Sequence, residues 1–68
     1  MDTDSAAIDR IRYDKANQKL FIRFVSGDEY LYVGVPGEVH RSFVNAPSKG
    51  GYFAKAIRDR YPYNRLDG

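Results

Sequence analysis

The most constraining feature of this chain is the alternation of side chains along residues 18–36. Apolar residues recur at every second position on both sides of Ser26-Gly27. A period of two is the spacing of a β-strand with one buried face, and Ser-Gly is a turn signal. The stretch therefore predicts a β-hairpin. Because a lone hairpin is only marginally stable in water, other parts of the chain must cover it.

The alternation also predicts how the two arms pair. A two-residue loop at Ser26-Gly27 sets Ile22 opposite Leu31 and Leu20 opposite Val33, and a four-residue loop keeps the same faces. An odd loop without a bulge would mix aliphatic and tyrosine side chains on one face. The even register is therefore favoured. Its aliphatic side is the predicted core face: Leu20, Ile22, Phe24, Leu31, Val33 and Val35.

Residues 8–14 predict a further strand, with Ile11 and Tyr13 in period-two spacing. A four-residue loop at 15–18 sets Ile11 against Ile22 and Tyr13 against Leu20. The result is a three-stranded antiparallel meander. Its second face would carry basic and aromatic side chains: Arg10, Arg12, Phe21, Arg23, Tyr30 and Tyr32.

The second half of the chain predicts two short helices. Pro36 favours a helix start near residue 37, and Pro47 disfavours helical geometry at Ala46. The Ser48 hydroxyl can cap a second helix, which residues 61–63 end. We expect an α+β fold of the order β-β-β-α-α, with both helices packed on one sheet face. Residues 1–7 are expected to form a flexible acidic tail, 8–65 a single domain and 66–68 a C-terminal tail.

Length and composition indicate the number of domains and the cellular compartment. Sixty-eight residues hold one core. The absence of cysteine removes disulfides and thiolate chemistry and favours a reducing compartment. The acidic start is unlike a signal peptide, and no apolar run reaches membrane-spanning length. We expect a bacterial cytoplasmic protein that makes no membrane contact.

The net charge of +2 is unevenly distributed. Residues 41–65 carry six basic side chains against Asp59 alone, a net charge of +5. A basic segment suits an anionic partner, because Lys and Arg release counterions from a phosphate backbone. On charge alone, a solvated helix surface explains the segment better.

The order and spacing of these features resemble the KTSC domain, a short module named after the C-terminal extension of some lysyl-tRNA synthetases. The hairpin residues that carry the resemblance are Leu20, Ile22, Phe24, Ser26, Gly27, Tyr30, Leu31, Tyr32, Val35 and Pro36. Those of the helical half are Val39, Phe43, Ala46, Ser48, Gly50, Tyr52, Phe53, Ile57 and Tyr61. His40 and Ala54 depart from the usual pattern. The resemblance implies a domain for which RNA binding has been suggested, and aminoacylation does not carry over to a chain without the synthetase catalytic domain.

The aromatic and basic residues form the candidate nucleic-acid site. Bases stack on aromatic rings while arginines hold phosphates. The candidates are Arg10, Arg12, Phe21, Arg23, Tyr30, Tyr32, Lys49, Lys55, Arg58 and Arg60. RNA, with tRNA one candidate, is the expected partner. Two alternatives remain open: cross-strand pairs that only stabilise the sheet, and a homodimer or other protein interface on the tyrosine face.

Other chemistry has little support in the sequence. Residues 48–51 could receive an anion at a helix start, but a tight interhelical turn explains them better. His40 is the only histidine and has no identifiable acidic partner. No His and carboxylate cluster has metal-ligand spacing. We therefore expect a non-catalytic protein without metal or cofactor.

Overall fold

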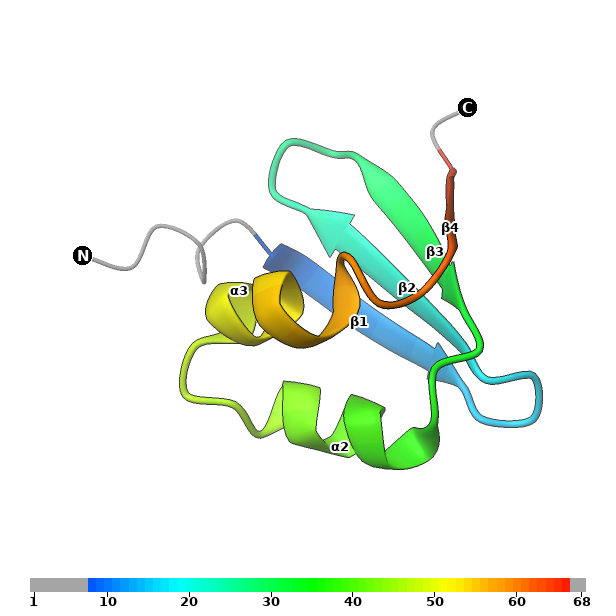
Figure 1. Ribbon diagram of the computed structural model, residues 1–68. Coiled ribbons are helices and arrows are strands. Elements are labelled where there is room, and N and C mark those ends of the chain that lie inside the picture. The colour runs from blue at the N-terminus through cyan, green and yellow to red at the C-terminus, as the bar shows by residue number, and fades with distance from the viewer. Residues whose placement is uncertain (1–7, 67–68) are drawn as a thin grey trace.

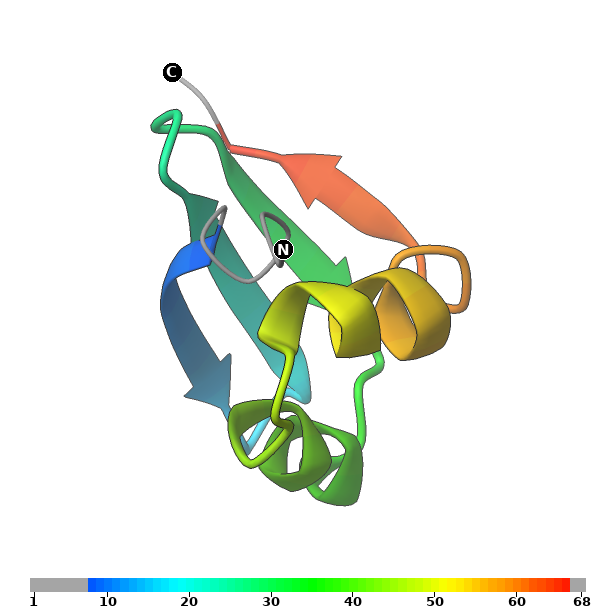
Figure 2. The ribbon, with the colours of Figure 1, turned by 90° about the vertical axis from the view of Figure 1, so that its left-hand side faces the viewer.

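A four-stranded antiparallel sheet forms one layer of the molecule, in a computed structural model that describes residues 8–66. The strands lie side by side in chain order: β1 (Ile8–Asp14), β2 (Lys19–Phe24), β3 (Glu29–Val33) and β4 (Tyr63–Arg65). Figure 2 shows β4 beside β3, at the edge opposite β1. The predicted tail at 1–7 lies outside the described residues, as do residues 67 and 68.

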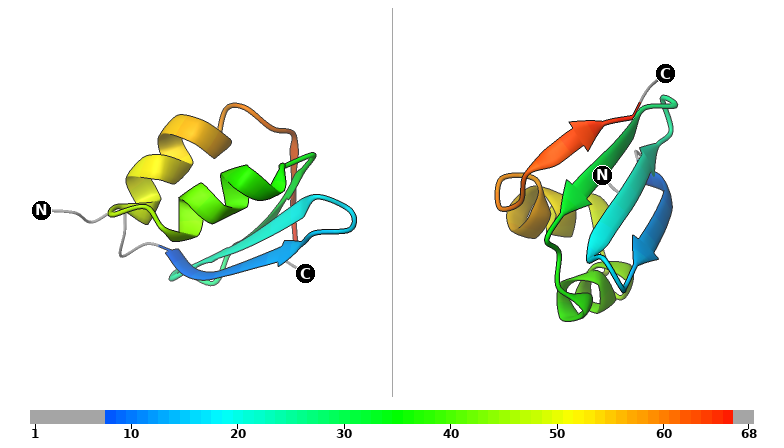
Figure 3. Two further views of the ribbon diagram at one scale, coloured as in Figure 1. Left: turned by 90° about the horizontal axis from the view of Figure 1, so that it is seen from below. Right: turned by 90° about the vertical axis from the view of Figure 1, so that its right-hand side faces the viewer.

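The helical segments form the second layer and cover one face of the sheet. They are α2 (Gly37–Val44), α3 (Lys49–Tyr52) and the π-helical turn η1 (Phe53–Ile57), which continues α3. Both helical runs lie on the same side of the strands (Figures 1 and 3). Between the layers lies the core: Leu20, Ile22, Tyr32, Val35, Phe43, Phe53 and Ile57. The predicted α+β architecture is confirmed.

The predicted strand number is wrong, because the sheet has four strands and not three. β4 comprises three exposed residues, and its Tyr63 pairs with Tyr32 of β3. So short and exposed a segment has no hydrophobic period. It joins the sheet because Pro62 and Leu66 extend the pairing, through bonds from the Val33 amide to Pro62 (3.0 Å) and from the Leu66 amide to Glu29 (2.8 Å).

The β1–β2 pairing is confirmed, with Ile11 opposite Ile22 and Tyr13 opposite Leu20. The predicted helix starts also hold, whereas the second helical run ends at Ile57, earlier than the predicted end at 61–63, and Tyr63 begins β4. Pro36 precedes α2, and the Gly51 amide donates to the Ser48 Oγ (3.1 Å) at the start of α3. These features follow from local chemistry that the sequence displays directly.

The predicted β2–β3 register is wrong by one residue. Leu20 lies opposite Tyr32, and Ile22 opposite Tyr30. The connection is a three-residue loop closed by two backbone bonds of 2.8 Å, from the Gly27 amide to Phe24 and from the Phe24 amide to Asp28. Gly27 has φ +100°, as expected for a turn whose last residue forms a bulge.

The register shift exchanges the two faces of β3. Tyr30 and Tyr32 lie on the helix-covered side, where Tyr32 is only 2% exposed. Leu31 pairs with the outward Phe21 and is not part of the core, nor is Val33. The rings suit these interior positions because Tyr32 packs against Phe53 of the helical layer and Tyr30 against Phe24, each with 5.5 Å between centroids.

Candidate functional site

The ten residues predicted to bind nucleic acid divide among three places. Four lie on the side of the sheet that no helix covers: Arg10, Arg12, Phe21 and Arg23. Lys49, Lys55, Arg58 and Arg60 belong to α3, η1 and the turn that follows, in the opposite layer. Tyr30 and Tyr32 lie between the layers, so the predicted single face with both tyrosines does not exist. Whether any of the ten binds RNA stays a prediction.

We call the uncovered side the open face and define it by Arg10, Arg12, Phe21, Arg23 and Leu31. Cross-strand pairing sets Arg10 beside Arg23 and Arg12 beside Phe21. The Arg12 guanidinium lies 4.3 Å from the centroid of the Phe21 ring, a cation–π contact. The Arg23 Nε lies 3.9 Å from the Asp9 carboxylate, and both side chains are about half exposed.

The alternation of β1 and β2 explains the open face. In each strand the inward positions are apolar, which leaves the arginines and Phe21 to point away from the helices. Phe21 is half-buried by its neighbours, and the three arginines are exposed. An aromatic ring thus lies among three cations on a surface open to solvent.

A cleft of about 600 Å³ lies on the helix side, at the end of the sheet where the β2–β3 loop approaches η1. We call it the aromatic cleft. Its lining is Phe24, Val25, Ser26, Asp28, Tyr30, Tyr32, Phe53, Arg58, Asp59 and Tyr63. The sequence did not indicate this cleft, because it depends on the one-residue register of β3 and on β4. The Tyr30-Leu31-Tyr32 spacing is the signal that could have located it.

Tyrosine rings pack closely in the cleft. Tyr63 lies 5.5 Å from Tyr30 and 5.4 Å from Tyr32, measured between ring centroids. Burial raises the pKa of Tyr32 to about 12, and the neighbouring Tyr63 and Tyr30 add to the effect. The Tyr32 hydroxyl therefore keeps its proton to a more alkaline pH than an ordinary tyrosine.

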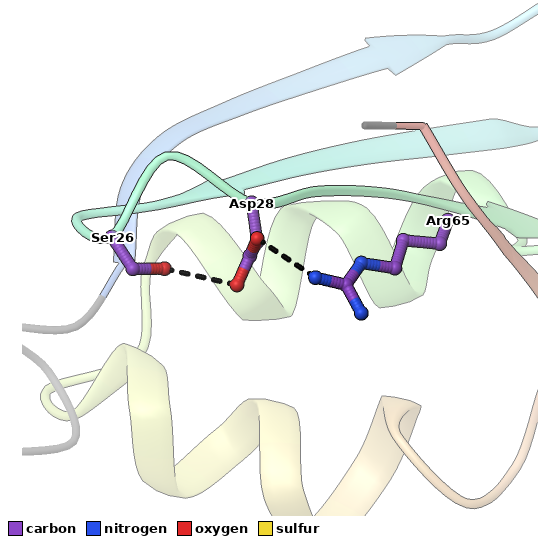
Figure 4. A network of polar contacts seen from close by, with 3 residues as sticks. All are labelled: Ser26, Asp28 and Arg65. Carbon is purple, nitrogen blue, oxygen red and sulfur yellow. Dashed lines mark hydrogen bonds and ion pairs between the residues drawn. The ribbon is translucent and has the colours of Figure 1, made fainter. Parts of the chain in front are cut away.

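A polar network holds one rim of the cleft (Figure 4). The Arg65 guanidinium donates to one Asp28 oxygen (3.1 Å), and the Ser26 hydroxyl donates to the other (3.1 Å). Arg65 also lies 5.9 Å from the Tyr30 ring centroid. The network joins β4 to the β2–β3 loop.

The other residues weighed in the sequence analysis, His40 and Ser48, make contacts that stabilise the fold. His40 stacks on Tyr13 with 4.5 Å between centroids, and the Tyr13 hydroxyl donates to the Val35 carbonyl (2.6 Å). The Ser48 hydroxyl caps α3. Within residues 8–66 no three His, Cys, Asp or Glu side chains gather to hold a metal ion. No helix of that described part is long and apolar enough to cross a membrane.

The fold and its surfaces define a small α+β module with one sheet face covered by helices and the other open. The KTSC domain matches residues 4–61 of the sequence. The crystal structure of a KTSC domain protein from Yersinia pestis is similar, with a TM-score of 0.86 and 36% identity over 93% of this chain and 89% of that one. The chain belongs to the KTSC domain family, and the resemblance in its sequence is confirmed.

Curated relatives are of two kinds. A lysine–tRNA ligase of Trichormus variabilis is 40% identical over 63 residues, which are 93% of this chain and 11% of the ligase. The chain thus spans only a small part of the ligases that it matches. A protein of Tsukamurella paurometabola is 38% identical over 58 residues, 85% of this chain and 87% of that protein. The domain therefore occurs in proteins of this size as well as within a ligase.

Proposed function

We propose that the chain is a non-catalytic RNA-binding module whose open face contacts the RNA. The observation that carries the proposal is the Phe21 ring among Arg10, Arg12 and Arg23 on an uncovered sheet. A base that stacks on Phe21 would place its flanking phosphates near these guanidinium groups. Stacking contributes about 1–3 kcal/mol per base, and the arginines contribute through counterion release.

Transfer RNA is the first RNA to test. Relatives of this chain form part of lysine–tRNA ligases, whose names specify a tRNA substrate. The basic residues of the helical layer would add to the general attraction of a polyanion without contacting the same strand. The proposal places the chain in the bacterial cytoplasm, a compartment that its cysteine-free composition suits.

The test is a titration of fluorescently labelled tRNA, followed by anisotropy between about 50 and 200 mM salt. The variant Arg10→Gln/Arg12→Gln removes two charges from the open face. Lys49→Gln/Lys55→Gln removes two charges from the helical layer and is the matched control. A plot of log K against log salt has a negative slope. We expect only the first variant to make this slope shallower by roughly 1.4–1.8, the value for two lost phosphate contacts.

Two results would contradict the proposal. One is the absence of binding by the wild type at low salt. The other is an equal loss in the two double variants, since that would assign binding to net charge and not to the open face.

Self-association or binding of another protein through the open face is the second candidate. It is favoured by Leu66, which is 40% exposed and lines a small recess of that face together with Phe21. Arg10 and Arg12 on each copy would oppose a symmetric dimer by like-charge repulsion, whereas Arg23 is paired with Asp9. Sedimentation equilibrium distinguishes the candidates: a dimer that Phe21→Ser dissociates would favour this one over RNA binding.

A further inference from the structure

The aromatic cleft is separate from the open face, because its lining side chains lie on the helix side of the sheet. We propose that this cleft binds a nucleotide, meaning a planar heteroaromatic base with one phosphate. Three features support it: the aromatic lining of the cleft, the Tyr32 hydroxyl and the Arg58 guanidinium. None of them belongs to the open face. The inference holds whether or not the open face binds RNA.

The size of the cleft suits such a ligand. Its volume of about 600 Å³ falls within the roughly 300–1,000 Å³ of small-molecule sites. Half of its ten lining residues are aromatic. Tyr63 is 53% exposed, and its ring is inclined by 54° to the Tyr30 ring, with 5.5 Å between centroids. A flat base can therefore stack on Tyr63 without displacing a ring of the core.

The Tyr32 hydroxyl is a polar group among these aromatic rings. Tyr32 is 2% exposed, and within residues 8–66 its hydroxyl has no hydrogen-bond partner. In the same described part, no fully buried side-chain oxygen or nitrogen lacks a partner. The Tyr32 oxygen must therefore reach the cleft. A protonated hydroxyl both donates and accepts, which suits the mixed donors and acceptors on the edge of a nucleobase.

The rim supplies a positive charge. The Arg58 side chain is 58% exposed, and its ion pair is a 3.9 Å contact with the adjacent Asp59. Arg65, by contrast, is engaged by Asp28 at 3.1 Å. Arg58 is therefore the guanidinium placed to bind a phosphate. The Asp59 carboxylate beside it opposes more highly charged ligands, which favours a monophosphate over a triphosphate.

A base with one phosphate has two sources: a free mononucleotide, or an unpaired nucleotide of an RNA strand. The ligand set therefore comprises the four 5′-mononucleotides, the corresponding nucleosides and a short single-stranded oligonucleotide. Nucleosides isolate the contribution of the base, because they lack the phosphate.

The experiment is an NMR titration of the full chain, read from the tyrosine and phenylalanine ring resonances. We expect at least one mononucleotide, or the oligonucleotide, to shift the rings of Tyr63 and Phe53. Arg58→Gln should weaken nucleotide binding about tenfold or more and leave nucleoside binding unchanged. Arg60→Gln is the matched control, since Arg60 lies two residues away and does not line the cleft. Tyr32→Phe should weaken both ligand types while the ring packing is kept.

Ring shifts with mononucleotides identify a free nucleotide as the ligand, and shifts with the oligonucleotide alone identify an RNA nucleotide. Absence of shifts in the cleft with every ligand would overturn the inference. Equal losses in Arg58→Gln and Arg60→Gln would overturn it too, by assigning binding to charge alone. Because Arg10→Gln/Arg12→Gln leaves the cleft intact, that variant should keep these shifts even if tRNA binding fails.

Discussion

At the scale of single residues, Tyr32 links the core to a surface. Its ring is buried against Phe53 and Tyr63, while its hydroxyl lacks a protein partner within the described residues. A buried ring with a phenolic oxygen is more costly to place than phenylalanine unless the oxygen is hydrated or binds a ligand. Phenylalanine would pack equally well here. The hydroxyl is therefore the feature that packing does not explain.

The raised pKa of Tyr32 makes stability depend on alkaline pH. The unfolded chain releases this proton near pH 10, whereas the folded chain holds it to about pH 12. The stabilisation is thus complete below pH 10 and is lost as the pH rises toward 12. Urea unfolding at about pH 9 and about pH 11.5 measures it. We expect the wild type to lose roughly 2 kcal/mol more than Tyr32→Phe over this interval, and equal losses would show that Tyr32 titrates normally.

Tyr13 is a contrasting residue, because its hydroxyl is used by the fold. It donates to the Val35 carbonyl at 2.6 Å and so ties β1 to the segment before α2. Tyr13→Phe leaves that carbonyl without its donor and should lower the free energy of unfolding by about 1–2 kcal/mol at neutral pH. Thermal unfolding compares it with Tyr32→Phe, for which we expect almost no change at that pH. An unchanged free energy of unfolding in Tyr13→Phe would contradict the role of this hydrogen bond.

At the scale of elements, the β2–β3 loop decides which face of β3 is buried. Gly27 has φ +100°, and a Cβ added there would meet no atom within 4 Å. Gly27→Ala should therefore lower stability by about 1 kcal/mol through backbone strain alone. Denaturant unfolding of Gly27→Ala measures the cost. Wild-type stability in this variant would contradict the three-residue loop.

The element scale also shows where the sequence is informative. Alternation located β1, β2 and β3. It also predicted the β1–β2 pairing, because Ile11 and Tyr13 each lie between polar residues and so mark the inward face of β1. It failed for β3 because Leu31 and Tyr32 can both be buried, so period two does not distinguish the faces. The packing of the Tyr32 ring on Phe53 and the positive φ of Gly27 decide the question, and both exist only in the assembled structure. Arg10, Arg12, Phe21 and Arg23 were predicted on one face and lie there, whereas Leu31 was predicted for the core. The aromatic cleft needs β4 and was not foreseen.

At the scale of the whole molecule, the sheet separates two surfaces of different chemistry. The open face presents guanidinium groups around one ring, whereas the cleft presents several rings with one available guanidinium. A strand of RNA would contact the first through many weak interactions, and a single nucleotide would enter the second. In our two proposals, polyanion binding and recognition of a single base belong to separate parts of the same small fold.

The most direct test of the central claim, RNA binding by the open face, is an amide NMR map of the chain titrated with tRNA at low salt. We predict that the largest shifts fall in β1 and β2, at Arg10, Arg12, Phe21 and Arg23, and that they decline as salt is added. Shifts confined to α2, α3 and η1, or a spectrum that tRNA leaves unchanged, would contradict the claim.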